Sequence, residues 1–372
     1  MISNIKILAL ASVFAVASCS SNDEVVFKNG DGGEPTTPTT PPDNTGNPTA
    51  QTLREKASWK VGAAVTTSAI KNEAKYDETL STNFSQLTAE YEMKMNRIWT
   101  SSSSYNWSET DYLVDYAEAN EMEVHGHTLV WYQSFPEWFK NANYDSTAFE
   151  NNIKRYITDV VTRYKGRIKS WDVVNEVFAD GGGHRQEGTI LPVFNDPIAF
   201  YGRCFQYARD ADPDAILFYN DYSVVLDSGK RAAMKRMATR FKNEGYPIDG
   251  LGDQFHYREV TSKETIKSGF ADMVSTGLLM HISELDIRMN TDKSDSYTFT
   301  DAEATKQAAT YKFIVEMFEA IPDNQKFAIT TWGVTDKYTW LTGWWHPKEY
   351  PLLFDREYNK KKAYEGFLEG IN

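Results

Sequence analysis

The 372-residue sequence predicts an α/β protein whose folded part is a single closed (β/α)8 barrel, the TIM barrel architecture. Eight short apolar runs alternate with helical patterns, nothing marks a second domain, and polar residues follow nearly all of the apolar runs. An open, doubly wound sheet is the alternative. No Gly-x-Gly-x-x-Gly turn follows the first apolar run, which disfavours that alternative.

The N-terminus resembles an export signal. Lys6 precedes an apolar stretch at 7–16, which is too short to span a bilayer, and small residues then lead to Cys19. Val-Ala-Ser-Cys at 16–19 resembles the bacterial lipobox, whose cysteine is acylated after cleavage. We therefore expect lipidation at Cys19 and a lipoprotein attached to the outer membrane or cell surface. An ordinary signal peptide that happens to contain a cysteine is the alternative.

A polar segment separates this signal from the folded part. From about residue 29 to 51 the chain is rich in Gly, Thr, Pro, Asn and Asp, a composition that buries too little apolar surface to fold. The expected organisation is a signal peptide at 1–18, a lipidated cysteine and linker at 19–52, and one barrel domain at 53–372.

Composition excludes several classes of partner. The net charge is −13 and no long Lys/Arg run occurs, so we do not expect nucleic acid to bind. Only Cys19 and Cys204 are present, which leaves no pair for a disulfide in the mature domain. We expect no metal or cofactor, because no cluster of metal-ligating residues stands out. The aromatic fraction of 14% is high, as expected either for aromatic faces that hold sugar rings along a cleft or for a Tyr-rich core and surface.

The alternation is clearest between residues 149 and 174. Apolar residues recur there at helical spacing up to Tyr164, Gly166 follows where a helix would end, and a β-branched run begins at Ile168. Strands are predicted, in order, at 61–65, 84–88, 124–131, 168–174, 215–219, 248–255, 279–285 and 327–332. Further helices are predicted at 111–119, 197–209, 229–243, 263–274 and 302–320.

Polar residues at the strand ends form a candidate site. Glu176 and Glu284 each follow an apolar run, and two carboxylates across one sugar-sized pocket are the minimum requirement for hydrolysing a glycosidic bond. In a barrel all of these strand ends meet on one face. The residues concerned are Glu90, Lys94, His127, Trp131, Asn175, Glu176, Asn220, Asp221, Tyr222, Gln254, His256, Glu284, Asp286 and Trp332.

These residues lie within motifs that resemble family 10 of the glycoside hydrolases, the endo-β-1,4-xylanases. The resemblance spans about residues 53 to 370, in order. Its main pieces are Gly-His-Thr-Leu-Val-Trp at 126–131, Trp-Asp-Val-Val-Asn-Glu at 171–176, Asn-Asp-Tyr at 220–222, Gln-Phe-His at 254–256, Glu-Leu-Asp-Ile at 284–287 and Pro-Leu-Leu-Phe-Asp at 351–355.

The resemblance implies a retaining mechanism. Glu284 would be the nucleophile, supported by His256 with Asp286 orienting the imidazole, and Glu176 would be the acid/base. The neighbouring Asn175 would bind the sugar 2-hydroxyl. In such enzymes the two carboxyl groups lie about 5 to 5.5 Å apart and the anomeric configuration is retained.

Further residues are expected to bind xylan or xylo-oligosaccharides. Lys94 and His127 would bind hydroxyls of the sugar at the −1 subsite, and Trp332 would pack against that sugar. Core packing is the alternative role for any one tryptophan. The full set of expected substrate-binding residues is Glu90, Tyr91, Lys94, His127, Trp131, Gln254, Trp332 and Trp340.

The sequence departs from the family pattern near the −2 subsite. Tyr91 stands where an Asn is usual, and Tyr132 to Ser134 replace His-x-Gln, so an amide expected at position 134 is missing. The segment 344–350 is longer than expected and adds two tryptophans. We expect weaker action on short linear oligomers and reliance on longer or decorated chains.

Two other functions remain open at this stage. A non-catalytic, surface-exposed xylan-binding protein could use the same barrel, and a β-1,4-glucanase or mannanase could use the same chemistry. Both carboxylates and the His256–Asp286 pair are present, which favours an enzyme.

Overall fold

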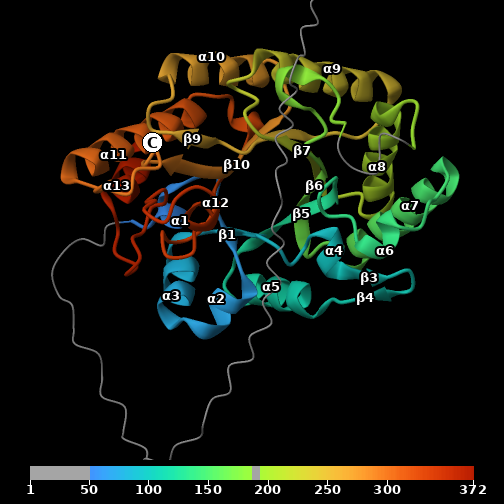
Figure 1. Ribbon diagram of the computed structural model, residues 1–372, viewed down its shortest axis with the longest axis horizontal. Coiled ribbons are helices and arrows are strands. Elements are labelled where there is room, and N and C mark those ends of the chain that lie inside the picture. The colour runs from blue at the N-terminus through green and yellow to red at the C-terminus, as the bar shows by residue number, and fades with distance from the viewer. Residues whose placement is uncertain (1–50, 187–192) are drawn as a thin grey trace, which may run out of the picture. The chain divides into compact units, whose positions relative to one another are not determined.

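The computed structural model describes residues 51–186 and 193–372, which form one barrel domain (Figure 1). The expected signal peptide, Cys19 and nearly all of the expected linker lie outside the described residues. Each barrel strand pairs in parallel with the next, and the last pairs with the first, so the predicted (β/α)8 barrel is confirmed. In order, the barrel strands are β1 Lys60–Val65, β2 Gln86–Ala89, β5 Glu123–Trp131, β6 Ile168–Asn175, β7 Ile216–Asp221, β8 Gly250–Asp253, β10 Leu279–Arg288 and β11 Lys326–Thr331.

Two strand predictions were too long, and in both places the backbone turns out of the sheet. Phe84 belongs to the end of the preceding helix, so β2 begins only at Gln86. β8 ends at Asp253, because Phe255 adopts a left-handed conformation with φ 58°. The chain then forms a separate short strand, β9 His256–Arg258, which pairs with the end of β10. This turn places His256 beside Asp286.

The six predicted helices are confirmed with small changes at their ends. Aspartate side chains, for example Asp145 and Asp227, cap helix N-termini by accepting backbone N–H bonds. The predicted helices are α5 Ser108–Ala119, α7 Ser146–Arg163, α8 Pro197–Ala211, α9 Ser228–Glu244, α10 Lys263–Val274 and α11 Asp301–Glu319.

Several elements were not predicted from the sequence. They are the helices α2 Thr67–Asn72, α3 Ala74–Asn83 and α13 Lys362–Gly370, the short helices α1 Leu53–Lys56, α4 Met95–Ile98, α6 Glu137–Lys140 and α12 Leu341–Trp344, the hairpin β3 Trp99–Ser101 with β4 Ser104–Tyr105, and the 3-10 turns η1 Asp180–Gly182 and η2 Asp323–Gln325. Within the described ranges, no helix combines the length and apolarity that crossing a membrane requires.

Tight packing holds the strands under the site. A Cβ added to Gly126 on β5 would lie 2.1 Å from the ring of Trp171 on β6, so glycine is needed there for close approach. Lower in the barrel, His281 is buried against aromatic rings, and burial lowers its pKa well below the usual value. The filled interior fixes the strand ends that carry the site. Cys204 lies buried in α8 as a free thiol.

Candidate active site

A cleft of about 520 Å³ opens at the carboxyl ends of the barrel strands. All of the expected catalytic, supporting and substrate-binding side chains line it except Asp286, which lies fully buried beneath it. The lining residues are Glu90, Tyr91, Lys94, His127, Trp131, Tyr132, Gln133, Asn175, Glu176, Tyr222, Ser223, Gln254, His256, Glu284, Arg288, Trp332, Trp340 and Trp344.

Glu284 projects from β10 into the cleft and is 5% exposed. One carboxylate oxygen accepts a hydrogen bond of 3.0 Å from the Asn220 amide, and the other lies 3.1 Å from Nε2 of His256. The Ser283 hydroxyl in turn donates to Oδ1 of Asn220 at 2.6 Å, which fixes that amide. Both oxygens of the Glu284 carboxylate therefore face hydrogen-bond donors. The sequence placed Asn220 at a strand end without identifying this role.

His256 bridges Glu284 and Asp286. Its Nδ1 lies 2.9 Å from the Asp286 carboxylate, which also accepts a hydrogen bond of 2.8 Å from the Trp340 indole. Burial lowers the pKa of His256, but the Asp286 and Glu284 carboxylates outweigh it and raise that pKa to about 10. At neutral pH the ring is therefore an imidazolium that donates from both nitrogens.

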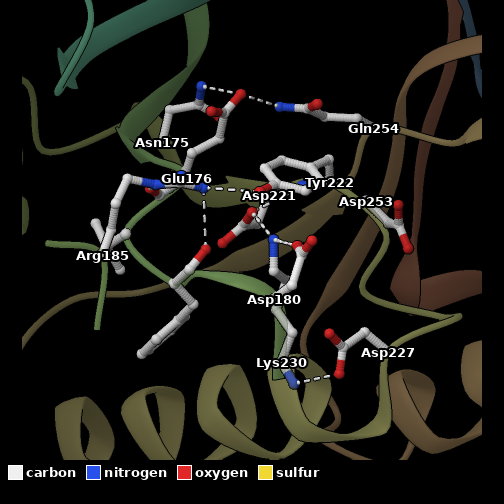
Figure 2. Close-up of polar contacts among 12 residues, drawn as sticks. Asn175, Glu176, Asp180, Arg185, Asp221, Tyr222, Asp227, Lys230, Asp253 and Gln254 are labelled. Carbon is white, nitrogen blue, oxygen red and sulfur yellow. Dashed lines mark hydrogen bonds and ion pairs between the residues drawn. The ribbon is translucent and has the colours of Figure 1, made fainter. Parts of the chain in front are cut away.

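Glu176 lies directly after β6 with φ 56°, and its backbone N–H donates to the Asn220 carbonyl at 2.9 Å. Figure 2 shows its carboxylate between two amides: Gln254 donates to it at 2.9 Å and Asn175 at 3.3 Å. Gln254, expected to bind substrate, thus contacts Glu176. Asn175 lines the cleft, and its Oδ1 is buried without a hydrogen-bond partner within the described ranges.

A polar network behind Glu176 holds the left-handed turn in place (Figure 2). The Arg185 guanidinium donates to the Glu176 carbonyl at 2.8 Å and to the Tyr222 hydroxyl at 3.0 Å. Between β7 and α9, the fully buried Lys230 lies 3.1 Å from Asp221, whose pKa burial raises to about 6. Sequence reasoning missed Arg185, since it lies in a segment without a clear pattern.

The β2 end contributes a carboxylate, a phenol and an amine. Burial raises the pKa of Glu90 to about 7, although a hydrogen bond from Tyr91 and the charge of Lys94 both oppose this rise. The Lys94 ammonium lies 5.1 Å from the centre of the Tyr91 ring and 4.8 Å from that of Trp131. Burial also lowers the pKa of Lys94, against the charges of nearby carboxylates that include Glu284 and Glu176.

On β5, His127 is held by a buried carboxylate. Its Nδ1 lies 2.8 Å from Asp172, and its ring packs edge-on against Trp332 with centroids 5.5 Å apart. The Asp172 contact occupies Nδ1, and the His127 side chain lines the cleft. Asp172 has a pKa below its usual range, because the two neighbouring histidines outweigh the effect of burial.

The structure changes the expectation for residues 132–134. Ser134 is 1% exposed and its hydroxyl donates to the Trp131 carbonyl at 3.1 Å, so this position does not face the cleft. Tyr132 and Gln133 line the cleft instead, and the Gln133 amide donates to the Tyr132 hydroxyl at 2.6 Å. An amide is therefore present in the wall, one residue earlier in the chain than the family pattern predicts.

The longer segment after Trp340 adds an aromatic surface. Trp344 stacks on Trp340 with centroids 4.7 Å apart and planes at 24°, and it remains 58% exposed. Trp344 lines the cleft, as expected for this segment, while the Trp345 indole is anchored by a hydrogen bond to the Asn290 carbonyl at 2.9 Å.

Comparison with known proteins identifies the family. The model of the family described as Glycosyl hydrolase family 10 matches residues 50–370. Endo-1,4-beta-xylanase C of Paenibacillus barcinonensis is 32% identical over 335 residues, which cover 84% of this chain and 31% of that protein. Endo-1,4-beta-xylanase B of Thermotoga neapolitana is 33% identical over 325 residues, covering 85% of this chain and 90% of that protein.

Solved structures of xylanases support the same family assignment. The native xylanase 10C structure from Cellvibrio japonicus superposes with a TM-score of 0.82 at 31% identity, covering 89% of this chain and 75% of that one. The chain spans about a third of the length of the Paenibacillus relative and half of another from Cellvibrio japonicus. With the family match over most of its length, the chain belongs to glycosyl hydrolase family 10.

Proposed function

We propose that the protein is an endo-acting enzyme that cleaves β-1,4-xylosidic bonds of xylan by a retaining, double-displacement mechanism. The observation that carries this proposal is the pair of glutamates with different surroundings in one cleft. Glu284 faces a charged donor, His256, and an amide, whereas the donors to Glu176 are neutral amides. Relatives named endo-1,4-beta-xylanase support the choice of xylan.

In the first step, Glu284 attacks the anomeric carbon while Glu176 donates its proton to the departing glycosidic oxygen. This forms a glycosyl ester on Glu284. In the second step, the ionised Glu176 removes a proton from water, which attacks the same carbon and releases Glu284. The His256 imidazolium stabilises Glu284 both as nucleophile and as leaving group.

The proposal assigns the sugar contacts as follows. Asn175, which lines the cleft, would form a hydrogen bond with the 2-hydroxyl of the −1 sugar. His127 and Lys94 would bind its other hydroxyls, and Trp332 would pack against the ring. All of these side chains line the cleft.

Two substitutions test the roles. Glu284→Ala should remove nearly all turnover on every substrate. Glu176→Ala should lose activity on xylan, yet keep much more on aryl xylosides whose leaving group needs no proton, with azide restoring the second step. Glu137→Ala, at a glutamate whose side chain is 80% exposed, is the matched control. Equal behaviour of the two site variants across leaving groups would contradict the assignment.

Substrate and stereochemistry need separate measurements. Purified protein should hydrolyse xylan but not cellulose or mannan, which separates a xylanase from a glucanase or mannanase. Binding of xylan without hydrolysis would instead support the non-catalytic alternative. NMR of the first products should show the β-anomer, as expected for retention.

We also propose that Cys19 is lipidated and anchors the protein at the outer membrane or cell surface. The support is the lipobox-like sequence at 16–19 and the polar linker that follows. Cells fed a labelled fatty-acid analogue should incorporate it into the wild-type protein but not into Cys19→Ala. Absence of label on the wild type would contradict lipidation.

A final proposal concerns short substrates. Tyr91 is 43% exposed in the cleft and hydrogen-bonds Glu90, so it occupies a place where the family pattern has an amide. We expect Tyr91→Asn to raise kcat/KM on xylotetraose but not on branched xylan. Because Ser134 is buried away from the cleft, a change there cannot restore a sugar contact. No gain, or equal gains on both substrates, would contradict this expectation.

A further inference from the structure

Arg288 lines the cleft and has few polar contacts with the rest of the protein. It ends β10, and its NH2 group donates one long hydrogen bond of 3.4 Å to the His256 carbonyl. Its Nε is buried without a partner, and it forms no ion pair with any residue of 51–186 or 193–372. A largely buried guanidinium without an anion is costly, because water is removed from the charge without compensation.

The two carboxylates that act most strongly on Arg288 are already engaged. Asp286 accepts hydrogen bonds from His256 and Trp340. Glu349 accepts backbone N–H bonds of 3.0 Å from Met289 and Asn290. The guanidinium therefore retains donor capacity that can serve a ligand in the cleft.

An open aromatic face adjoins this guanidinium. The Arg288 carbon Cζ lies 5.7 Å from the Trp344 ring centre and 4.8 Å from that of Trp345. One face of Trp344 packs on Trp340, and more than half of the Trp344 side chain stays exposed. A large exposed indole that lines a sugar-binding cleft is suited to stacking against a sugar ring.

Together, a stacking face and an unpaired guanidinium match a sugar that carries a carboxylate. The chain has a net charge of −13, so an acidic polysaccharide is repelled overall and needs a local cation to bind well. Guanidinium groups bind carboxylates in a bidentate fashion. We propose that Arg288 and Trp344 form a subsite for a uronic acid residue carried as a branch on xylan, an inference that rests on the proposed xylanase function.

The test compares one polymer in two charge states. Glucuronoxylan is assayed before and after chemical reduction of its uronic acid carboxyl groups, which removes the charge and keeps the branch. The variants are Arg288→Gln, Arg288→Lys and Trp344→Ala. Arg236→Gln is the matched control, because Arg236 is an exposed arginine on helix α9 that does not line the cleft. Melting temperatures check that each variant is folded.

We expect wild-type kcat/KM to be about five- to tenfold higher on the native than on the reduced polymer, as charge-assisted hydrogen bonds allow. Arg288→Gln should bring this ratio close to one, Arg288→Lys should keep part of it, and Arg236→Gln should leave it unchanged. Added salt should reduce the wild-type ratio. Trp344→Ala should lower kcat/KM about five- to tenfold on both polymers, since stacking does not depend on the charge.

The following results would contradict the subsite, the stacking contact or the proposed function. A wild-type ratio near one, or equal losses on both polymers in Arg288→Gln, would overturn the uronic acid subsite. Unchanged kinetics of Trp344→Ala would overturn the stacking contact. Absence of wild-type hydrolysis of either polymer would instead contradict the proposed function, so the two failures are distinguishable.

Discussion

Replacing Asp286 by Asn removes one of the two charges that keep His256 protonated. The pKa of His256 rises from 6.5 to about 10, which corresponds to about 5 kcal/mol of stabilisation of the imidazolium. Asp286 contributes more to this rise than Glu284 does, and burial of the ring opposes both, so removing the Asp286 charge should cost more than half of it. In Asp286→Asn the pKa of His256 should therefore fall by roughly two pH units.

This change should be visible in the pH dependence of activity. As the pH rises, His256 loses its proton and Glu284 loses a charged donor, so kcat/KM should fall near pH 10 in the wild type. In Asp286→Asn the fall should come near pH 8. The assay uses an aryl xylobioside with a good leaving group, because proton donation by Glu176 then does not shape the profile.

The free energy of unfolding should also depend on the protonation of His256. Because the folded-state pKa of His256 is raised, its contribution to the free energy of unfolding is complete below about pH 6.5 and is lost as the pH rises through about 10. Asp286→Asn should remove much of this alkaline loss. Trp340→Phe is the control, since it removes a hydrogen bond to Asp286 but no charge. Identical alkaline limbs in wild type and Asp286→Asn would refute the reasoning.

Two further predictions concern the network behind Glu176. Lys230→Met should lower the free energy of unfolding by about 3 to 5 kcal/mol, because Asp221 is then buried without its cation. Chemical denaturation of the double variant Lys230→Met with Asp221→Asn should show partial recovery of that stability. Full stability of the single variant would contradict the pairing. Gly182→Ala should lower kcat by about 10- to 100-fold. Gly182 has φ 84°, and a Cβ added there would lie 2.1 Å from the Gly229 carbonyl oxygen. The clash should displace the segment that follows Glu176. Gly183→Ala, which meets nothing within 4 Å, should behave as wild type, and equal effects of the two changes would argue against this constraint.

The sequence alone predicted the barrel and the composition of its carboxyl face. Apolar periodicity is a local property, so it located the strands that end near Glu176 and Glu284 without knowledge of the fold. In a parallel barrel those ends must meet, and the cleft indeed contains both glutamates. Helices α2 and α3 were missed; with six and ten residues, both are shorter in the structure than every helix that was predicted.

Only the tertiary structure decided which side chains meet. The left-handed Phe255 turns His256 out of β8 and onto the end of β10, where it can bridge Glu284 and Asp286. Packing turned Ser134 inward and left Gln133 in the cleft wall, although the two are adjacent in sequence.

Charge pairing likewise depended on the fold. Nothing in the sequence shows that Arg185 supports the turn of Glu176, or that Arg288 lacks an ion pair among the described residues. Hydrophobic periodicity is set by near neighbours along the chain and can be read directly. Hydrogen bonds and ion pairs form between residues tens or hundreds of positions apart, so their partners are fixed only when the strands close into the barrel.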